Sequence, residues 1–157
     1  VLDADGLNAL ADHPQGLADG AGPRIVTPHV GEFKRLVGRA DRELEVLHKA
    51  AVDVAARHGL VVVLKHHRTF VTDGGRVAVN ATGNPGMATG GAGDVLTGII
   101  VALLCQGLPP WEAARLAVHV HGLAGDCAAD ALTQVAMTAR DLVRYLPQAF
   151  AAVGRDA

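Results

Sequence analysis

The stretch that decides the fold is Thr82-Gly-Asn-Pro-Gly-Met-Ala-Thr-Gly-Gly-Ala-Gly-Asp94. It is rich in glycine and runs directly into an apolar segment of helical length, residues 95–104. Glycines let backbone N–H groups approach a ligand closely. The start of a helix leaves N–H donors unpaired at the positive end of the helix dipole. The stretch therefore predicts an anion-binding loop that enters a helix.

Asp94, the last residue of this loop, is unusual for a simple anion site because its carboxylate would repel phosphate. It suits a site where a proton is accepted beside a phosphate that is being transferred. The loop is not a Walker A motif, since no Lys-Ser or Lys-Thr follows Gly93, and the dinucleotide fingerprint also fails. The plainer alternative is a glycine-rich connection in which Asp94 only caps the helix.

The composition is that of one folded domain or most of one. Half of the 157 residues are apolar but only 3% are aromatic, so Ala, Val and Leu must supply the core. The formal charge of −2 argues against nucleic acid or an anionic membrane as a partner. No apolar stretch is long enough to span a membrane. Cys105 and Cys127 fit no metal or redox motif and are predicted to be reduced and buried, as in a cytoplasmic protein.

Apolar patterning predicts an α/β layered sandwich with a mostly parallel sheet. Strands are expected at residues 1–2, 24–27 and 60–64, and the last is apolar without alternation, as in a strand covered on both faces. Residues 69–72 and 77–80 predict a β-hairpin. The expected helices are 7–11, 32–37, 42–58 with Asp41 as its cap, 95–106, 110–131 and 139–150.

Three of these apolar strands end in charged or titratable residues. Leu2 is followed by Asp3 and Asp5, the second strand by His29, and the third by Lys65. Each could simply mark the point where the chain reaches water. Ligands of open parallel sheets bind outside the carboxyl ends of the strands. We therefore expect the three strand ends to converge with the glycine loop at one site.

Five segments match a known family in its own order and together span nearly the whole chain. They are Val1-Leu-Asp-Ala-Asp-Gly-Leu-Asn8, Thr27-Pro-His-Val-Gly-Glu32, Val62-Val-Leu-Lys65, Gly83-Asn-Pro-Gly-Met-Ala-Thr-Gly-Gly-Ala-Gly-Asp-Val-Leu-Thr-Gly98 and His121-Gly-Leu-Ala-Gly-Asp126. The sequence resembles the ADP- or ATP-dependent NAD(P)H-hydrate dehydratases, a branch of the ribokinase-like small-molecule kinases. The Asn-Pro-Gly-Met segment separates this branch from sugar and vitamin kinases.

The resemblance implies a ribokinase-like three-layer sandwich, with residues 1–157 as the C-terminal portion of a single domain. The N-terminal part of the family's domain carries its own glycine-rich substrate-binding segment and has no match here. The chain expressed alone is therefore expected to be poorly stable and inactive. The implied activity is a repair reaction that returns the S-epimer of hydrated NADH or NADPH to the dinucleotide and consumes ADP or ATP with Mg²⁺. The resemblance also implies a cytoplasmic homo-oligomer such as a tetramer.

The family's functional residues carry over by position. Asp94 is implied to contact the hydrated nicotinamide and to act as the base, and His29 to line the substrate site. The residues implied to bind the nucleotide are Lys65, His66, His67, Arg68, Thr69 and Gly93. The backbone N–H groups of Gly91, Ala92 and Gly93 are expected to face the transferred phosphate. Glu32 takes the position of a residue that organises Mg²⁺ through water.

His66 departs from the family pattern, which has glycine after the nucleotide-strand lysine. It costs nucleotide affinity if the position needs φ > 0 or close ligand contact, or it is a harmless surface histidine. The other histidines fit no metal pair, since His119 and His121 do not share a helix face. The histidines expected to face solvent are His13, His48, His58 and His67.

Two other functions remain open from the sequence. One is a kinase of the same fold that phosphorylates a thiazole or pyrimidine precursor without elimination. The other is a non-catalytic nucleotide-binding remnant, which the absent N-terminal match allows.

Overall fold

The computed structural model describes residues 1–17, 22–40 and 43–154, and the α/β class predicted from the sequence is confirmed. The helices are α1 (Ala4–Asp12), α2 (Val30–Val37), α3 (Leu44–His58), α4 (Ala92–Cys105), α5 (Pro110–Leu132) and α6 (Ala139–Val153). The strands are β1 (Arg24–Val26), β2 (Leu60–Leu64), β3 (Phe70–Thr72) and β4 (Val77–Val79). Two short 3-10 turns are η1 (Pro14–Leu17) and η2 (Pro85–Met87).

The strands form one sheet in the order β1-β2-β3-β4. β1 and β2 run parallel, with Ile25 opposite Val61, and Leu2 extends the parallel arrangement through a bridge to Val26. β3 and β4 form the predicted hairpin and pair antiparallel, β3 also with β2. The sheet is therefore mixed, which corrects the expectation of a mostly parallel one. The reason is the hairpin itself, because a short turn can join only antiparallel neighbours.

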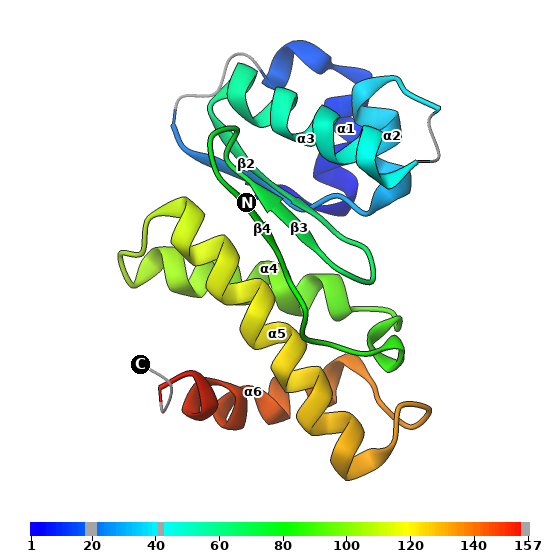
Figure 1. Ribbon diagram of the computed structural model, residues 1–157, viewed down its shortest axis with the longest axis vertical. Coiled ribbons are helices and arrows are strands. Elements are labelled where there is room, and N and C mark those ends of the chain that lie inside the picture. Colours follow the sequence, from blue (N-terminus) through cyan, green and yellow to red (C-terminus); the bar gives the residue numbers. More distant parts are fainter. Residues whose placement is uncertain (18–21, 41–42, 155–157) are drawn as a thin grey trace.

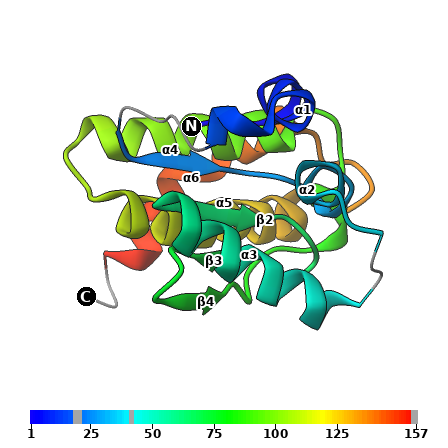
Figure 2. The same ribbon diagram turned by 90° about the horizontal axis from the view of Figure 1, so that it is seen from above.

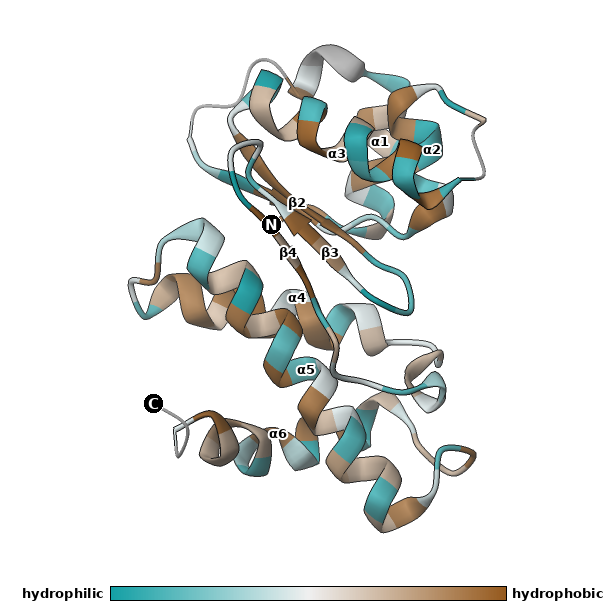
Figure 3. Cartoon of the chain, in the orientation of Figure 1, coloured by the Kyte–Doolittle hydropathy of each residue, from teal (hydrophilic) through white to brown (hydrophobic). Residues whose placement is uncertain are grey.

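Helices cover both faces of the sheet and make the predicted three-layer sandwich (Figure 1). Alternate strand residues point to opposite faces. On one face Val62 and Leu64 pack with α1, α2 and α3 around Phe33. On the other, Val61 and Val63 pack with α4 and α5. All of β2 is buried, as predicted for a strand covered on both faces, and the apolar strands lie between the helical layers in Figure 3.

α5 supports both the sheet and the outermost helix. In the view from above it passes beneath β2 (Figure 2), and it packs with that strand in the same apolar cluster. On its far side, Val120 and Ala124 pack against Ala149 of α6. The long α5 is therefore the element on which the C-terminal half of the molecule is assembled.

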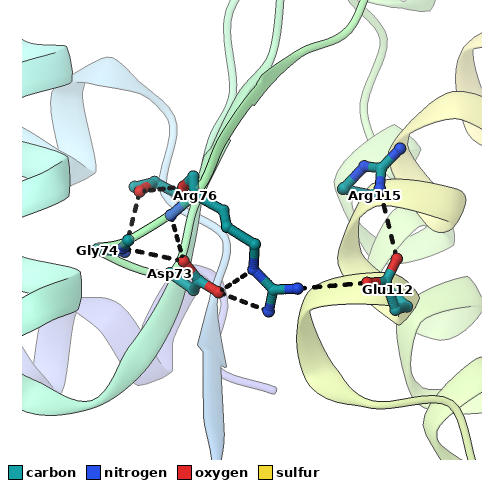
Figure 4. A network of polar contacts seen from close by, with 7 residues as sticks. Asp73, Gly74, Arg76, Glu112 and Arg115 are labelled. Atoms are coloured by element: carbon teal, nitrogen blue, oxygen red, sulfur yellow. Dashed lines mark hydrogen bonds and ion pairs between the residues drawn. The ribbon is translucent and has the colours of Figure 1, made fainter.

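An ion-pair network joins the β3–β4 hairpin to α5 (Figure 4). Arg76 pairs with Asp73 across the turn at 2.7 Å, and its Nη1 lies 3.5 Å from Glu112. Arg115 pairs with the same glutamate at 3.4 Å, and both guanidinium groups lie over the Trp111 ring. The charged side chains of Arg76, Glu112 and Arg115 are about half exposed, so each pair adds little stability alone. Together they fix the orientation of the hairpin on the helix.

The structure corrects one further sequence expectation. Cys105 is exposed and Cys127 is only partly buried, although both are free as predicted. Cys105 is the last residue of α4, where the chain leaves the core. The cap predicted at Asp41 lies outside the described residues. Within ranges 1–17, 22–40 and 43–154, no helix has the length and apolar character needed to cross a membrane.

Candidate active site

The three predicted strand ends meet at one edge of the sheet. His29 and Lys65 form a parallel bridge beyond β1 and β2, and the Lys65 amide donates to the Pro28 carbonyl at 2.8 Å. The Lys65 ammonium donates to Asp3 Oδ1 at 2.7 Å, and Asp3 directly follows the parallel bridge at Leu2. The convergence expected from the sequence is confirmed, because parallel segments end at the same edge.

Asp3 is the centre of a small polar cluster that includes Lys65 and Thr97. The Thr97 hydroxyl donates to Asp3 Oδ2 at 3.1 Å. The Asp3 side chain is 11% exposed and that of Lys65 is 22% exposed. Burial raises the pKa of Asp3, but the hydrogen bond and positive charge of Lys65, together with hydrogen bonds from Thr27 and the Ala4 backbone, lower the pKa overall. Asp3 is therefore a partly buried anion that holds Lys65 in place.

The sequence predicted that Asp3 lies at this edge but gave it no specific role, and it did not predict a role for Thr97. Asp3 follows the end of a strand, but so does Asp5, and the sequence pattern does not show which of the two carboxylates belongs to the site. Asp5 is exposed in the first turn of α1. Thr97 lies inside an apolar run, where nothing in the pattern distinguishes a functional hydroxyl from an ordinary helix residue.

Gly93 lies against this cluster. A Cβ at Gly93 would stand 3.3 Å from the Lys65 Nζ and 3.4 Å from Asp3 Oδ2. These distances leave little room for a side chain, so glycine lets the first turn of α4 approach the ion pair closely. The backbone at the helix start and the Lys65 ammonium are thereby brought to one place, as an anion site requires.

The N-terminus of α4 offers free backbone donors beside Lys65. Gly91 precedes the helix with φ of 87°, a left-handed conformation that favours glycine. The Ala92 amide already donates to the Thr89 carbonyl at 3.3 Å. Within the described part of the chain, the amides of Gly91, Gly93 and Asp94 have no hydrogen-bond partner. Of the three residues predicted to face a phosphate, Gly91 and Gly93 are thus available, and Ala92 is committed to the loop.

Asp94 occupies the first turn of α4 and is exposed. No hydrogen bond or ion pair joins its carboxylate to another described residue. The structure contradicts the alternative in which Asp94 only caps the helix. Gly91 is the cap residue, and no side chain forms a capping hydrogen bond there. A carboxylate that is accessible and unpaired is free to accept a proton from a bound ligand.

His29 is the N-cap of α2 and forms a capping box with Glu32. Its Nδ1 accepts from the amides of Gly31 and Glu32 at 2.9 and 3.2 Å, and Glu32 accepts from the His29 amide at 2.8 Å. Because Nδ1 is an acceptor, a neutral His29 carries its hydrogen on Nε2. The ring is 55% exposed, so this N–H can be shared between Glu32 at 3.5 Å and a ligand.

The turn at residues 65–69 is supported by stacked rings. His66 stacks on His48 with centroids 5.3 Å apart, and His48 stacks on Phe70 at 4.1 Å. The two Nε2 atoms of the histidines are 3.1 Å apart. His66 Nδ1 accepts from the Arg68 amide at 3.2 Å, so the Nε2 of a neutral His66 is the donor to His48. The Thr69 hydroxyl closes the turn on the His66 carbonyl at 3.3 Å.

These contacts answer the part of the question about His66 that concerns its backbone and its exposure. Burial lowers the pKa of His66 to about 4, with further lowering by the charges of His48 and His67. The residue does not have φ > 0; among described non-glycine residues only Ala4 and Thr133 do. His66 is thus neither strained nor a free surface side chain. Of the histidines expected to face solvent, His13 and His67 are exposed, but His48 and His58 are partly buried.

His121 lies beneath the helix start, on α5. Burial lowers its pKa to about 4, a hydrogen bond with the Ala92 backbone opposes this shift, and the charge of Lys65 adds to it. Its Nε2 is buried without a hydrogen-bond partner in the described structure. His121 is therefore neutral at pH 7 and supports the back of the site as an uncharged ring.

The donor set fits a phosphate better than a directly bound metal ion. The described residues contain no group of three His, Cys, Asp or Glu side chains arranged to hold a metal ion. Glu32, the predicted magnesium residue, uses one oxygen for the His29 amide. Mg²⁺ usually keeps several waters and binds through one or two carboxylates and substrate phosphates, so a water-bridged role for Glu32 is compatible with this geometry.

Two surface hollows lie away from this cluster. One is lined mainly by α3 residues together with Phe70, and the other by Leu108, Glu112 and their neighbours. Neither is lined by Asp94 or Lys65. Neither hollow therefore marks the candidate site at Lys65 and Asp94.

Comparison with known proteins gives one consistent family. The model of the NAD(P)H-hydrate dehydratase family matches residues 1–148. The bifunctional NAD(P)H-hydrate repair enzyme Nnr of Thermofilum pendens is 43% identical over 99% of this chain and 30% of its own length. The ADP-dependent (S)-NAD(P)H-hydrate dehydratase of Neisseria meningitidis is 45% identical over 80% of this chain and 44% of its own.

A solved structure has the same fold. The ADP/ATP-dependent NAD(P)H-hydrate dehydratase of Bacillus subtilis, co-crystallised with ATP and Mg²⁺, superposes with a TM-score of 0.77 at 36% identity. The match covers 83% of this chain and 49% of that one. The chain thus spans less than half of the length of each of these relatives.

Proposed function

The chain belongs to the NAD(P)H-hydrate dehydratase family, and we propose that it carries the catalytic part of an ADP- or ATP-dependent repair enzyme. The substrate is the S-epimer of hydrated NADH or NADPH, and the product is the intact dinucleotide. We propose in the same way that the protein needs Mg²⁺, works as a homo-oligomer in the cytoplasm, and includes residues 1–157 in one domain.

One observation carries the proposal. The start of α4 brings unpaired backbone donors and the unpaired Asp94 carboxylate to the edge where Lys65 is held by Asp3. Donors and an ammonium group stabilise phosphate, whereas an accessible carboxylate a few residues along serves proton transfer. A simple anion site would need the backbone donors and the ammonium group but not the carboxylate.

The chemistry follows from these parts. Asp94 accepts the proton of the hydrate's hydroxyl group while the oxygen attacks the terminal phosphorus of the nucleotide, whose bond to the bridging oxygen breaks and releases AMP from ADP or ADP from ATP. The amides of Gly91 and Gly93 and the Lys65 ammonium face the charge on the transferred group. The C–O bond to the phosphate then breaks and a proton leaves the adjacent carbon, which restores the dihydropyridine. Phosphate is a much better leaving group than hydroxide, so the transfer makes the dehydration feasible.

Mg²⁺ supplies charge neutralisation of the nucleotide phosphates when it is bound. Within this chain, Glu32 is the residue that would orient its waters. Lys65 to Thr69 and Gly93 hold the nucleotide in this proposal, and His29 contributes its Nε2 to the substrate side.

The test is a repair assay on the intact protein with the purified S-epimer of hydrated NADH and either ADP or ATP. Recovery of the dihydropyridine absorbance, dependent on nucleotide and matched by released phosphate, is expected. A phosphorylated product that accumulates without elimination would instead identify a small-molecule kinase. Nucleotide binding without turnover would identify a non-catalytic remnant.

A further inference from the structure

Residues 121–126 of α5, with the sequence His-Gly-Leu-Ala-Gly-Asp, lie against the first half of the glycine loop, and Asp126 takes no part in the chemistry described above. We propose that Asp126 is a positioning residue: it fastens the beginning of the glycine loop to α5 and thereby fixes where Asp94 stands. The catalytic part of this inference rests on the proposed function. The mechanical part rests on contacts alone.

Asp126 binds the loop with both carboxylate oxygens. Its Oδ2 accepts from the Gly83 amide at 2.8 Å and its Oδ1 accepts from the Asn84 side-chain amide at 3.0 Å. The other end of the Asn84 amide accepts from the Gly86 amide at 3.1 Å. The direction of donation is fixed along this chain of hydrogen bonds, because the Asn84 side chain must donate to Asp126 and accept from the Gly86 amide. A carboxylate is the group that suits position 126, since both partners there are donors.

The helix surface around Asp126 is shaped for the loop. A Cβ at Gly122 would collide with Thr82, and a Cβ at Gly125 would collide with Met87. The Thr82 hydroxyl also donates to the His119 carbonyl at 2.9 Å. Thr82 and the Met87 side chain therefore pack directly on the α5 backbone, at Gly122 and Gly125.

The far end of the loop is held by the same helix. Ala92 is buried in a cluster with Ala128, Met137 and Leu142, and Met87 packs against that cluster. The loop is thus anchored twice on α5, at Asp126 and near Ala128, and Asp94 follows two residues after the second anchor. Displacement of a reacting group by about 1 Å can cost about 10²-fold in rate. Loosening the loop at Asp126 is therefore expected to displace Asp94 and to lower the rate.

Asp126→Asn breaks this arrangement without changing its shape. The new side chain has one accepting oxygen and one donating NH₂, so one of the two donors at the loop meets another donor. Adding Asn84→Asp reverses the polarity: the amide at position 126 then donates to a carboxylate at position 84, which still accepts from the Gly86 amide. The amide oxygen at 126 still accepts from the Gly83 amide. The double variant therefore restores every hydrogen bond that the single variant loses.

The experiment is a double-mutant cycle on the intact protein with the parent, Asn84→Asp, Asp126→Asn and the double variant. We expect Asp126→Asn to lower kcat by about tenfold or more while the Kd for ADP stays within about twofold, because Lys65 follows β2 and is held by Asp3, and neither residue contacts Asp126. The double variant should recover most of kcat. Asp130→Asn, the same change at an exposed site on α5, is the matched control and should leave both constants unchanged.

Amide hydrogen exchange over residues 82–91 gives a readout that does not depend on turnover. It should be faster in Asp126→Asn and slow again in the double variant. If the parent has no repair activity, the proposed function fails, and unchanged exchange in Asp126→Asn would then overturn the anchor as well. If the parent is active, a kcat within twofold for Asp126→Asn, or a double variant no better than that single one, would overturn the positioning role.

Discussion

The two segments that face each other at the candidate site are held in opposite ways. The turn at residues 65–69 rests on side chains, with His66 stacked on His48 and His48 on Phe70. The glycine loop rests on backbone atoms, because a side chain at Gly86 would collide with the backbone of Gln134. Side chains can move to accommodate a substitution, but backbone cannot. The turn can therefore depart from the family's sequence, as it does at His66, and the loop matches it.

The largest effect is expected at the end of the loop. Asp94→Asn keeps the shape of the side chain and removes its ability to accept a proton, so kcat should fall by about 10²- to 10⁴-fold. The Kd for ADP should remain near that of the parent, since no described contact joins Asp94 to Lys65. Steady-state assays and calorimetric titration would measure the two constants, with Asp130→Asn as the charge-matched control. Turnover within tenfold of the parent would exclude Asp94 as the base.

On the opposite segment, the expected effect is on binding. Lys65→Ala removes an ammonium that faces the proposed phosphate, and a charge-assisted hydrogen bond of this kind is worth about 1.5–3 kcal/mol, or about 10- to 100-fold in Kd. The change also leaves the partly buried Asp3 carboxylate without its cation, which destabilises the fold. Thermal unfolding must therefore accompany the titration, and Lys49→Ala provides the same charge change at an exposed lysine. Equal weakening of ADP and of hydrated NADH would contradict the assignment.

The sequence predicted the elements of this site better than their supports. The strand ends and the loop were predictable because they depend on local features: the spacing of apolar residues, the glycine content and the order of the strands. These features place Lys65, His29 and Asp94 at one edge of the sheet. The Asp3–Thr97 contact joins residues 94 positions apart, and no local pattern signals it. The same holds for Asp126, whose motif was visible in the sequence although its partners Gly83 and Asn84 were not.

The alternation of strands and helices along the sequence also failed to predict the direction of the outer strands. Runs of strands and helices predict a parallel sheet, but the hairpin formed by β3 and β4 reverses the chain within a few residues and turns half of the sheet antiparallel. The hairpin itself was predicted from its turn residues. What the sequence pattern lacked was the information that β3 pairs with β2.

A smaller effect is expected on the pH dependence of the folding stability, and it distinguishes His66 in the turn from His121 behind the start of α4. His66 and His121 both have a pKa of about 4, below the ordinary 6.5, because burial disfavours their charged forms. Between pH 6.5 and 4 the unfolded chain binds more protons than the folded one, so stability falls as pH falls through this window and levels off below it. Urea unfolding at several pH values would measure the slope. His121→Gln should flatten it more than His66→Gln, since the more exposed His66 is better screened by solvent.

The smallest effect is expected for His66→Gly, which restores the family's residue. Since the His66 backbone does not have φ > 0, glycine relieves no strain there, and it removes the ring that packs on His48. Glycine also adds about 0.5–1 kcal/mol of backbone entropy to the unfolded chain. We therefore expect ADP to bind equally or up to a few-fold more weakly, with a slightly lower unfolding temperature. His13→Gly, which makes the same change at an exposed histidine outside the proposed site, corrects for the entropy of glycine alone. Tighter ADP binding in His66→Gly than in His13→Gly would show that His66 obstructs the nucleotide, and the ring stack would then weaken binding instead of supporting the turn.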